Sequence, residues 1–409
     1  MNAMIARLAW KNIWRNRVRS SVILSAIALG LFSGTYIDSF MKGWIVDTVN
    51  SDINSHLSHV QIHDTAFLAN NDINAFFLRS FVSEPIEAAG LAVSTAYRLI
   101  LPGMLASANN AVGITVKGVV PGEEKAVSTI ENQIPDTLGA FLPDDARMPI
   151  VISKKIAEKL KVKLKSKIVF TFQDAQGEMQ SLAFRICGIY KTTNGMFDEG
   201  NVFVRYSDIF PSTGLPEGAV HEAGVRMADL ETCETVAPPL KNLFSTLSVR
   251  DWGELNPALS MSMAWMDFFG IIIVGIFLLA LSFGIINTML MAILERTREL
   301  GMLSAIGMAK GRIFRMIMLE TVFLTVLGSM AGIVLAALVI LPSMKSGIDL
   351  SFLMEDQFED YGFGSIIYPV LNAKMFVQML VLVISAGILS ALYPARKALK
   401  LKSLEAIRQ

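Results

Sequence analysis

Three of the four histidines lie close together, at positions 56, 59 and 63. Imidazole nitrogens bind zinc and other transition metals, so this spacing raises the question of a metal site. If the segment is a strand, His59 and His63 share one face, whereas Val60 and Ile62 point to the other. No cysteine, aspartate or glutamate stands at a suitable ligand spacing. We therefore interpret the histidines as the hydrated face of a strand and assign the chain no metal ligand.

Sequence motifs for nucleotide binding and hydrolysis are absent. The chain contains no G-x-x-x-x-G-K-S/T phosphate-binding loop, no H-E-x-x-H and no G-x-S-x-G. We therefore expect no catalytic residue and no bound cofactor, and any work driven by ATP and Mg needs a second polypeptide. The net charge is zero, with 36 basic and 36 acidic residues, and we expect no nucleic-acid partner.

The segment at residues 295–308, ERTRELGMLSAIGM, joins a charged beginning to an apolar strip. Its apolar residues recur every three positions, which places them on one side of a short helix. The charged rim comprises Glu295, Arg296, Arg298 and Glu299, and the strip comprises Leu300, Leu303, Ile306 and Gly307. Such a strip has no core of its own to enter at a membrane surface. It either lies on lipid headgroups or docks in a groove of a soluble partner.

Four long apolar stretches must position this segment, and they lie near residues 21–40, 266–294, 314–341 and 373–392. About twenty helical residues cross the ~30 Å hydrocarbon layer, and the mean hydropathy of +0.49 agrees with several such spans. The prediction is an α-helical membrane protein with four transmembrane helices. A large α+β extracytoplasmic domain is inserted between helices 1 and 2.

Basic residues gather before the first span, between spans two and three, and after the last span. The positive-inside rule therefore places both termini and the 295–313 loop in the cytoplasm. The expected segments are a cytoplasmic amphipathic helix lying on the inner membrane surface (1–20), transmembrane helices (21–42, 266–294, 314–342, 373–393), the outer α+β domain (43–265), the cytoplasmic loop (295–313), an acidic outer loop (343–372) and a cytoplasmic tail (394–409).

Alternating patterns in the outer region predict strands over 59–63, 113–119, 149–153, 167–172, 181–190 and 201–206, and a helix over 154–160. Residues 65–145 differ in pattern from 146–250, which predicts two subdomains. Cys187 and Cys233 are the only cysteines, and an oxidising compartment would permit a disulfide between them. The apolar run around Cys187 favours a buried free thiol instead.

Small and polar residues within the spans indicate helix packing. Gly328 and Gly332 are four positions apart and would let another helix approach closely. Asn287 is a polar group at membrane depth, and such groups usually face protein. We expect Glu320 beside the basic loop and propose no proton relay for it.

The 295–308 segment, followed by residues 312–320, closely resembles the signature of FtsX-like ABC transporter permeases. The N-terminal LAWKNIWRNRVRS and the closing LYPARKALKLKSLEAIR resemble the same family. In the outer region SHVQIH, GVVPGEE and WGELNP are similar to the LolC/LolE lipoprotein-releasing branch. Residues 165–167 depart from the family, which usually has glycine before the strand.

The resemblance implies four helices per subunit, an outer domain with porter-like and sabre-like parts, and a dimer of permeases on two ABC ATPase subunits. It also implies that residues 295–307 form a coupling helix that docks on the ATPase and transmits motion across the membrane. Lipoprotein cargo and a periplasmic carrier are then further expected partners. The alternatives are a MacB-like efflux permease, an FtsX-like regulator of cell-wall hydrolysis that transports nothing, and a receptor or scaffold that uses no ATP.

Overall fold

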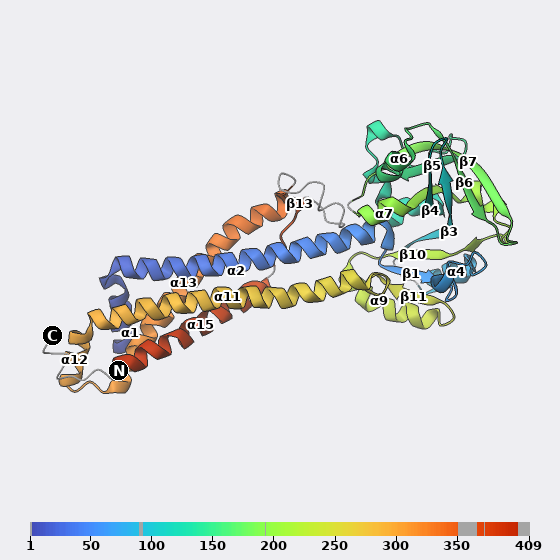
Figure 1. Ribbon diagram of the computed structural model, residues 1–409. Coiled ribbons are helices and arrows are strands. Elements are labelled where there is room, and N and C mark those ends of the chain that lie inside the picture. Colours follow the sequence, from blue (N-terminus) through green and yellow to red (C-terminus); the bar gives the residue numbers. More distant parts are fainter. Residues whose placement is uncertain (1, 90–92, 193, 351–365, 372, 400–409) are drawn as a thin grey trace. The chain divides into compact units, whose positions relative to one another are not determined.

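The computed structural model describes residues 2–89, 93–192, 194–350, 366–371 and 373–399 (Figure 1). These residues form two compact units. The first unit contains the described residues of 1–45, 263–349 and 366–399, and the second contains those of 46–262. The helices α2 and α11 each begin in one unit and end in the other.

The first unit is helical. Its elements are α1 (Asn2–Arg15), α2 (Arg17–Asp52), α11 (Pro257–Glu295), α12 (Thr297–Ala305), α13 (Lys310–Ser346), α15 (Ala373–Leu399) and the short strands β12 (Ile348–Asp349) and β13 (Ile366–Ile367). In the described part of the chain, four helices are long and apolar enough to cross a membrane, and they contain the four predicted spans. With 37 residues, α13 extends well beyond the ~30 Å hydrocarbon layer at ~1.5 Å per residue.

Helix α1 packs its apolar side against the protein itself. Ile5, Ala9 and Ile13 are buried in one cluster with residues of α2, α11, α12, α13 and α15. Trp10 stacks edge-on against Phe323 of α13, with ring centroids 5.7 Å apart. This side of the helix therefore faces the neighbouring helices, while Trp10 and Trp14 are 41% and 49% exposed, and the position of the helix on the inner membrane surface stays a prediction.

The second unit is the predicted α+β domain. Its helical elements are η1 (Ile53–Leu57), α3 (Phe67–Asn70), α4 (Ser80–Ala88), α5 (Pro121–Val127), η2 (Ile130–Gln133), η3 (Asp136–Leu138), α6 (Lys154–Leu160), α7 (Gly195–Gly200), α8 (Tyr206–Ile209), η4 (Phe210–Ser212), α9 (Leu230–Leu243) and α10 (Trp252–Leu255). Its strands are β1 (Val60–His63), β2 (Phe77–Leu78), β3 (Ser94–Ala106), β4 (Ala111–Val119), β5 (Pro149–Ser153), β6 (Lys167–Gln173), β7 (Met179–Tyr190), β8 (Asn201–Arg205), β9 (Ala219–Val220), β10 (Glu222–Arg226) and β11 (Ser248–Asp251). The predicted strands and the 154–160 helix are confirmed.

Nine of the described strands form one sheet in the order β11-β1-β10-β3-β4-β8-β5-β7-β6, and β6 also pairs with the end of β3. This last pairing closes β3, β4, β8, β5, β7 and β6 into a six-membered ring of strands. Gly103 permits the closure, because a Cβ at that position would lie 2.5 Å from the Thr171 carbonyl oxygen.

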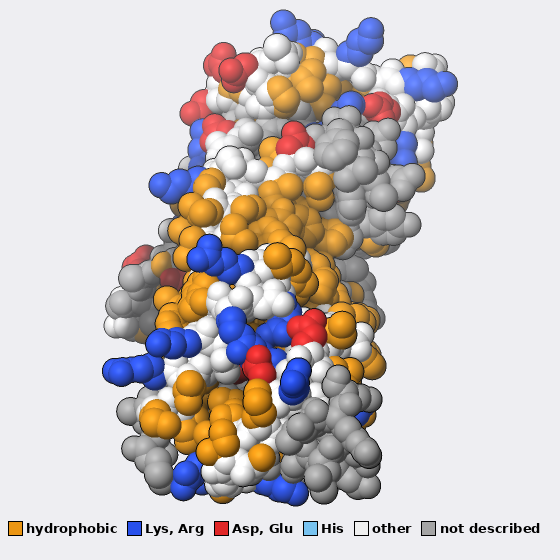
Figure 2. Space-filling view, turned by 90° about the vertical axis from the view of Figure 1, so that its left-hand side faces the viewer, with side chains coloured by type: hydrophobic (Ala, Val, Ile, Leu, Met, Phe, Trp, Pro, Cys, Tyr) orange, Lys and Arg blue, Asp and Glu red, His pale blue; other side chains and the backbone are white. Residues whose placement is uncertain are grey.

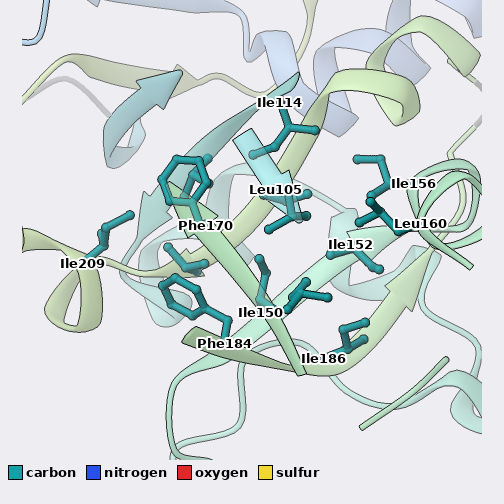
Figure 3. Close-up of a cluster of buried hydrophobic side chains, with 14 of the residues drawn as sticks. Leu105, Ile114, Ile150, Ile152, Ile156, Leu160, Phe170, Phe184, Ile186 and Ile209 are labelled. Carbon is teal, nitrogen blue, oxygen red and sulfur yellow. The ribbon is translucent and has the colours of Figure 1, made fainter. Parts of the chain in front are cut away.

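The interior of the ring is a hydrophobic core (Figure 3). On β6 the burial alternates, so that Ile168, Phe170 and Phe172 point inward. Ile150 and Ile152 of β5 enter the same cluster. Burial of each such side chain contributes about 1.5–3 kcal/mol, so this core fixes the strand register.

The remaining strands, β11, β1 and β10, extend the sheet from β3, and α4 and α9 cover one of its faces. The sequence predicts two subdomains without fixing the seam between them, and the sheet does not divide near residue 145. Strand β3 belongs to both parts, and β4 pairs in parallel with β8 across some 80 residues of sequence. The ring strands β3 to β8 all lie within residues 94–205, whereas β1 precedes this stretch and β10 and β11 follow it.

Candidate functional site

The turn between α11 and α12 is held by a buried arginine. Nη1 of Arg296 lies 3.2 Å from each carboxylate oxygen of Glu320 on α13. Its Nη2 donates to the Asn12 carbonyl oxygen of α1 at 3.0 Å. Arg296 and Glu320 are 9% and 5% exposed. Breaking a buried pair of this kind from one side costs about 3–5 kcal/mol, so the turn is firmly attached to α1 and α13.

Further ion pairs surround the turn. Arg19 of α2 lies 3.1 Å from Glu295 and 3.9 Å from Glu320. Arg15 of α1 lies 2.7 Å from Glu299 of α12, and both of these side chains are about half exposed. An isolated exposed pair contributes little, about 0–1 kcal/mol. Here Arg19 and Arg296 share Glu320, so these pairs tie the α11–α12 turn to α2 and α13, while the pair of Arg15 ties α12 to α1.

Sequence reasoning missed Asn12, Arg15 and Arg19 as members of this site. The sequence did contain a signal for this pairing. The N-terminal segment carries arginines but no acidic residue, and acidic residues that can pair with them lie at positions 295, 299 and 320. Glu320 does lie beside the basic loop, as expected.

The apolar strip of α12 does not form one exposed surface. Leu300 is 7% exposed and belongs to the helical core, and Leu303 packs against the same core. The expectation that this strip has no core of its own is therefore wrong for both residues. The exposed apolar side chains are Met302 at 47% and Ile306 at 85%, and Arg298 is exposed on the same helix.

Gly307 ends the helix. Its φ is +94°, and the Met308 amide donates to the Leu303 carbonyl at 3.0 Å, which is the bonding pattern of a Schellman cap. A left-handed residue at this point strains any side chain with a Cβ. The glycine therefore serves to terminate α12, whose last residue is Ala305.

A hollow of about 340 Å³ lies among α1, the end of α11, α12 and α13. Its lining is mainly apolar and includes Leu8, Met302, Leu303 and Ile306, while the charged groups of the ion pairs stand at its rim. A second hollow of about 490 Å³ is bounded by Arg15, Arg17, Arg19, Glu295 and Arg296. Figure 2 shows basic side chains gathered around acidic ones on one face of the molecule, with hydrophobic side chains beside them.

The small residues of α13 lie directly against α2. A Cβ on Gly328 would lie 2.8 Å from Ile27, and a Cβ on Gly332 would lie 2.8 Å from the Ala28 carbonyl oxygen. Asn287 is different, because it is exposed on α11. The expectation that Asn287 packs helices together is therefore wrong within this single chain.

The histidines of the second unit are not hydrated. His59 and His63 are 5% and 3% exposed, and the His63 ring stacks on Phe67 of α3 with ring centroids 5.9 Å apart. His63 contacts the His221 carbonyl oxygen and Gln61 Oε1, both at 3.0 Å. The predicted hydrated face is therefore wrong: these side chains are buried and hydrogen-bonded.

His63 begins a row of buried polar residues across three strands. It pairs with Glu222, which pairs with Arg98. Arg98 binds Glu222 and forms two further bonds of 2.8 Å to Glu124. Burial raises the pKa of Glu222, but the charges of Lys117 and Arg98 outweigh it and lower the pKa to about 2. The cluster thus consists of mutually neutralised charges.

Both cysteines are free thiols in the structure. Cys187 is partly buried and Cys233 is buried. Burial raises the pKa of both thiols to about 11.

Comparison with known proteins supports the family resemblance. Residues 271–403 match the family described as FtsX-like permease C-terminal. An uncharacterized ABC transporter permease of Methanocaldococcus jannaschii is 27% identical over 235 residues, which cover 55% of each chain. The macrolide export protein MacB of Chlorobaculum tepidum is 34% identical over 125 residues, 31% of this chain and 16% of MacB. These matches span about half or less of those relatives.

The lipoprotein-releasing system transmembrane protein LolC of Neisseria meningitidis is 23% identical over 323 residues, which cover 75% of each chain. Among solved structures, the periplasmic region of MacB from Actinobacillus actinomycetemcomitans is 11% identical, with a TM-score of 0.34 over 52% of this chain and 97% of that one. A TM-score of this size does not establish a shared fold.

Proposed function

Because residues 271–403 form an FtsX-like permease domain, we propose that this chain is the membrane subunit of an ABC transporter that transmits ATP-driven motion to its α+β domain. ATP and Mg are bound by separate ATPase subunits. The chain lies in a bacterial inner membrane with both termini and α12 in the cytoplasm, and the α+β domain is periplasmic. It works as a dimer with a second permease, either another copy or a related chain.

The attachment of α12 to its neighbours carries this proposal. The Arg15–Glu299 pair joins α12 to α1, and the pairs of Arg19 and Arg296 join the turn before α12 to α2 and α13. At the same time Ile306, directly after α12, is exposed. A force applied to α12 by a docked ATPase would therefore pass into two long helices. Such motion requires that the helices and the α+β domain have two conformations and that ATP binding shifts the population from one to the other.

Lipoprotein release is the activity that we favour, with lipoproteins as the cargo. The matches to LolC proteins cover 72–75% of this chain, whereas the matches to MacB proteins cover 31–40% of it. Macrolide-type efflux is the second candidate, since the MacB of Chlorobaculum tepidum has the higher identity of 34% over its shorter match. An FtsX-like regulator of cell-wall hydrolysis is the third, and in that case nothing is transported.

The test is depletion of the chain in its own cell, followed by separation of the inner and outer membranes. Lipoproteins should accumulate in the inner membrane, and expression of the intact chain should reverse this. Unchanged lipoprotein distribution together with increased macrolide sensitivity would favour efflux, and a defect in cell separation alone would favour the regulator. Purification of the solubilised chain should recover an ATPase. Absence of any nucleotide-hydrolysing companion would contradict the proposal as a whole.

A further inference from the structure

Asp52, the last residue of α2, is a buried carboxylate that joins two other parts of the second unit. It is 4% exposed. Its Oδ1 accepts a hydrogen bond from Asn194 Nδ2 at 2.9 Å, and its Oδ2 accepts one from Asn256 Nδ2 at 3.4 Å. Hydrogen bonds to an ionised acceptor are stronger than bonds between neutral groups. The two oxygens of one side chain therefore hold two separate segments.

Each asparagine also begins a helix. Asn256 Oδ1 accepts from the Leu259 amide at 3.1 Å, at the start of α11. Asn194 Oδ1 accepts from the Phe197 amide at 3.0 Å and caps α7. In both asparagine side chains, the amide oxygen thus accepts a hydrogen bond at a helix N-terminus and the amide nitrogen donates one to Asp52. The end of α2 is bonded through them to the beginning of α11 and of α7.

The turn that follows Asp52 is bonded to the sheet. Residues 53–57 form the π-helical turn η1, and the Asn54 carbonyl accepts from the Thr129 amide at 2.7 Å. The His56 carbonyl accepts from Arg98 Nη1 and from Gln61 Nε2, each at 3.3 Å. The carbonyls that normally remain unpaired at a helix end are therefore bonded to the α+β domain.

We infer that Asp52, Asn194 and Asn256 form a mechanical junction that makes the outer ends of α2 and α11 move as one body with the α+β domain. The functional role of this junction rests on the proposed function, because a transporter that transmits motion to its α+β domain needs a rigid connection between that domain and the helices. It concerns residues outside the family match at 271–403. The junction contains no catalytic group and acts by positioning alone.

The test separates helix capping from the bond to Asp52. Asn256→Ser keeps a good N-cap for α11 and removes the Nδ2 donor. Asp52→Asn is the second variant, because it keeps the side-chain shape and removes the charge. Asn110→Ser is the matched control, since its Nδ2 donates to the Lys159 carbonyl at 2.7 Å instead. All are made in the full chain with both cysteines replaced by serine.

Spin labels at the exposed Glu158 and Ser262 then report the distance between α6 and the beginning of α11 in lipid nanodiscs. The distance distribution should be narrow in the unaltered chain and in Asn110→Ser, and broad in Asn256→Ser and Asp52→Asn. If both junction variants keep the narrow distribution, the inference is overturned. This first measurement needs no ATPase and so does not depend on the proposed function.

The second measurement uses the complex with its ATPase and labels at Glu158 and Lys345. The unaltered chain should show a distance that changes on ATP binding, and Asn256→Ser should lose this change while ATP hydrolysis continues. An unchanged ATP response in Asn256→Ser would overturn the role of the junction in transmission. If the unaltered chain shows no response, the proposed function fails, while the first measurement still decides whether the junction is rigid.

Discussion

Arg296 and Glu320 meet in the interior of the helical unit, at the point where the chain turns from α11 into α12. The guanidinium uses one nitrogen for both carboxylate oxygens, at 3.2 Å, and another for the Asn12 carbonyl oxygen at 3.0 Å. Three elements that are distant in sequence are thereby joined through one side chain. Because a buried charge without its partner is costly, α12 cannot separate from α13 without a large loss of free energy.

Glu320→Gln should strongly destabilise the chain. The substitution leaves Arg296 charged and buried, and loss of one partner of such a pair costs about 3–5 kcal/mol. Thermal unfolding of the purified chain in detergent measures the effect. Glu299→Gln is the control, because its pair with Arg15 is exposed and should contribute about 0–1 kcal/mol. Equal effects of the two substitutions would show that the interior pair has no special role.

Ile306→Asp should reduce ATPase binding without affecting the stability of the chain. Ile306 is 85% exposed, and surface substitutions usually change stability by less than about 0.5 kcal/mol. A partner that covers this side chain would have to bury the new charge. Binding of the ATPase to the immobilised chain gives the affinity, and thermal unfolding gives the stability.

Leu300→Ala provides the opposite case. Leu300 is 7% exposed in the helical core, so its truncation should cost about 2–5 kcal/mol of stability. We expect it to impair ATPase binding only through the loss of folded protein. If Leu300→Ala weakens binding at a temperature where the chain is fully folded, while Ile306→Asp does not, the docking surface has been assigned to the wrong side of α12.

The elements of the fold follow from local patterns in the sequence. Apolar runs predict the long helices, and alternation predicts strands such as β6, where Ile168, Phe170 and Phe172 all face the core. Closure of the strand ring is not local. It depends on the pairing of Met104 with Thr171, which no spacing within either strand indicates.

The errors have a common physical cause. A polar residue that alternates with apolar ones is expected to face water, but His63 is buried, because Phe67 of α3 stacks on its ring and the His221 carbonyl oxygen contacts it. The apolar strip that contains Leu300 is predicted to have no core of its own at a membrane surface, yet α1 and α13 supply a core for Leu300. In each case a distant part of the chain contributes to the cover: His221 contacts His63, and α1 lies in the same core as Leu300.

Gly332→Ala should destabilise the helical unit. Its Cβ would lie 2.8 Å from the Ala28 carbonyl oxygen of α2, and backbone atoms in a packed helix cannot move aside cheaply. Overpacking of this kind costs about 1–3 kcal/mol. Gly284→Ala is the matched control, since no atom lies within 4 Å of its added Cβ. A helix favours alanine over glycine, so the control should be neutral or stabilising in the same thermal unfolding assay.

The stability of the α+β domain should fall in acid because of Glu222. Its pKa is about 2 in the folded chain against an ordinary value of 4.5, so the folded state favours the charged form. The stabilisation is present above pH 4.5 and is lost as the pH falls from there towards 2. Glu222→Gln should lower stability at neutral pH, because Arg98 and Lys117 lose a counter-charge. It should also flatten the dependence of stability on pH between 4.5 and 2.

Glu158→Gln, at an exposed position, serves as the control and should keep the original dependence of stability on pH. Chemical denaturation of the full chain at a series of pH values provides the measurement, and a profile that Glu222→Gln leaves unchanged would contradict the role of this carboxylate.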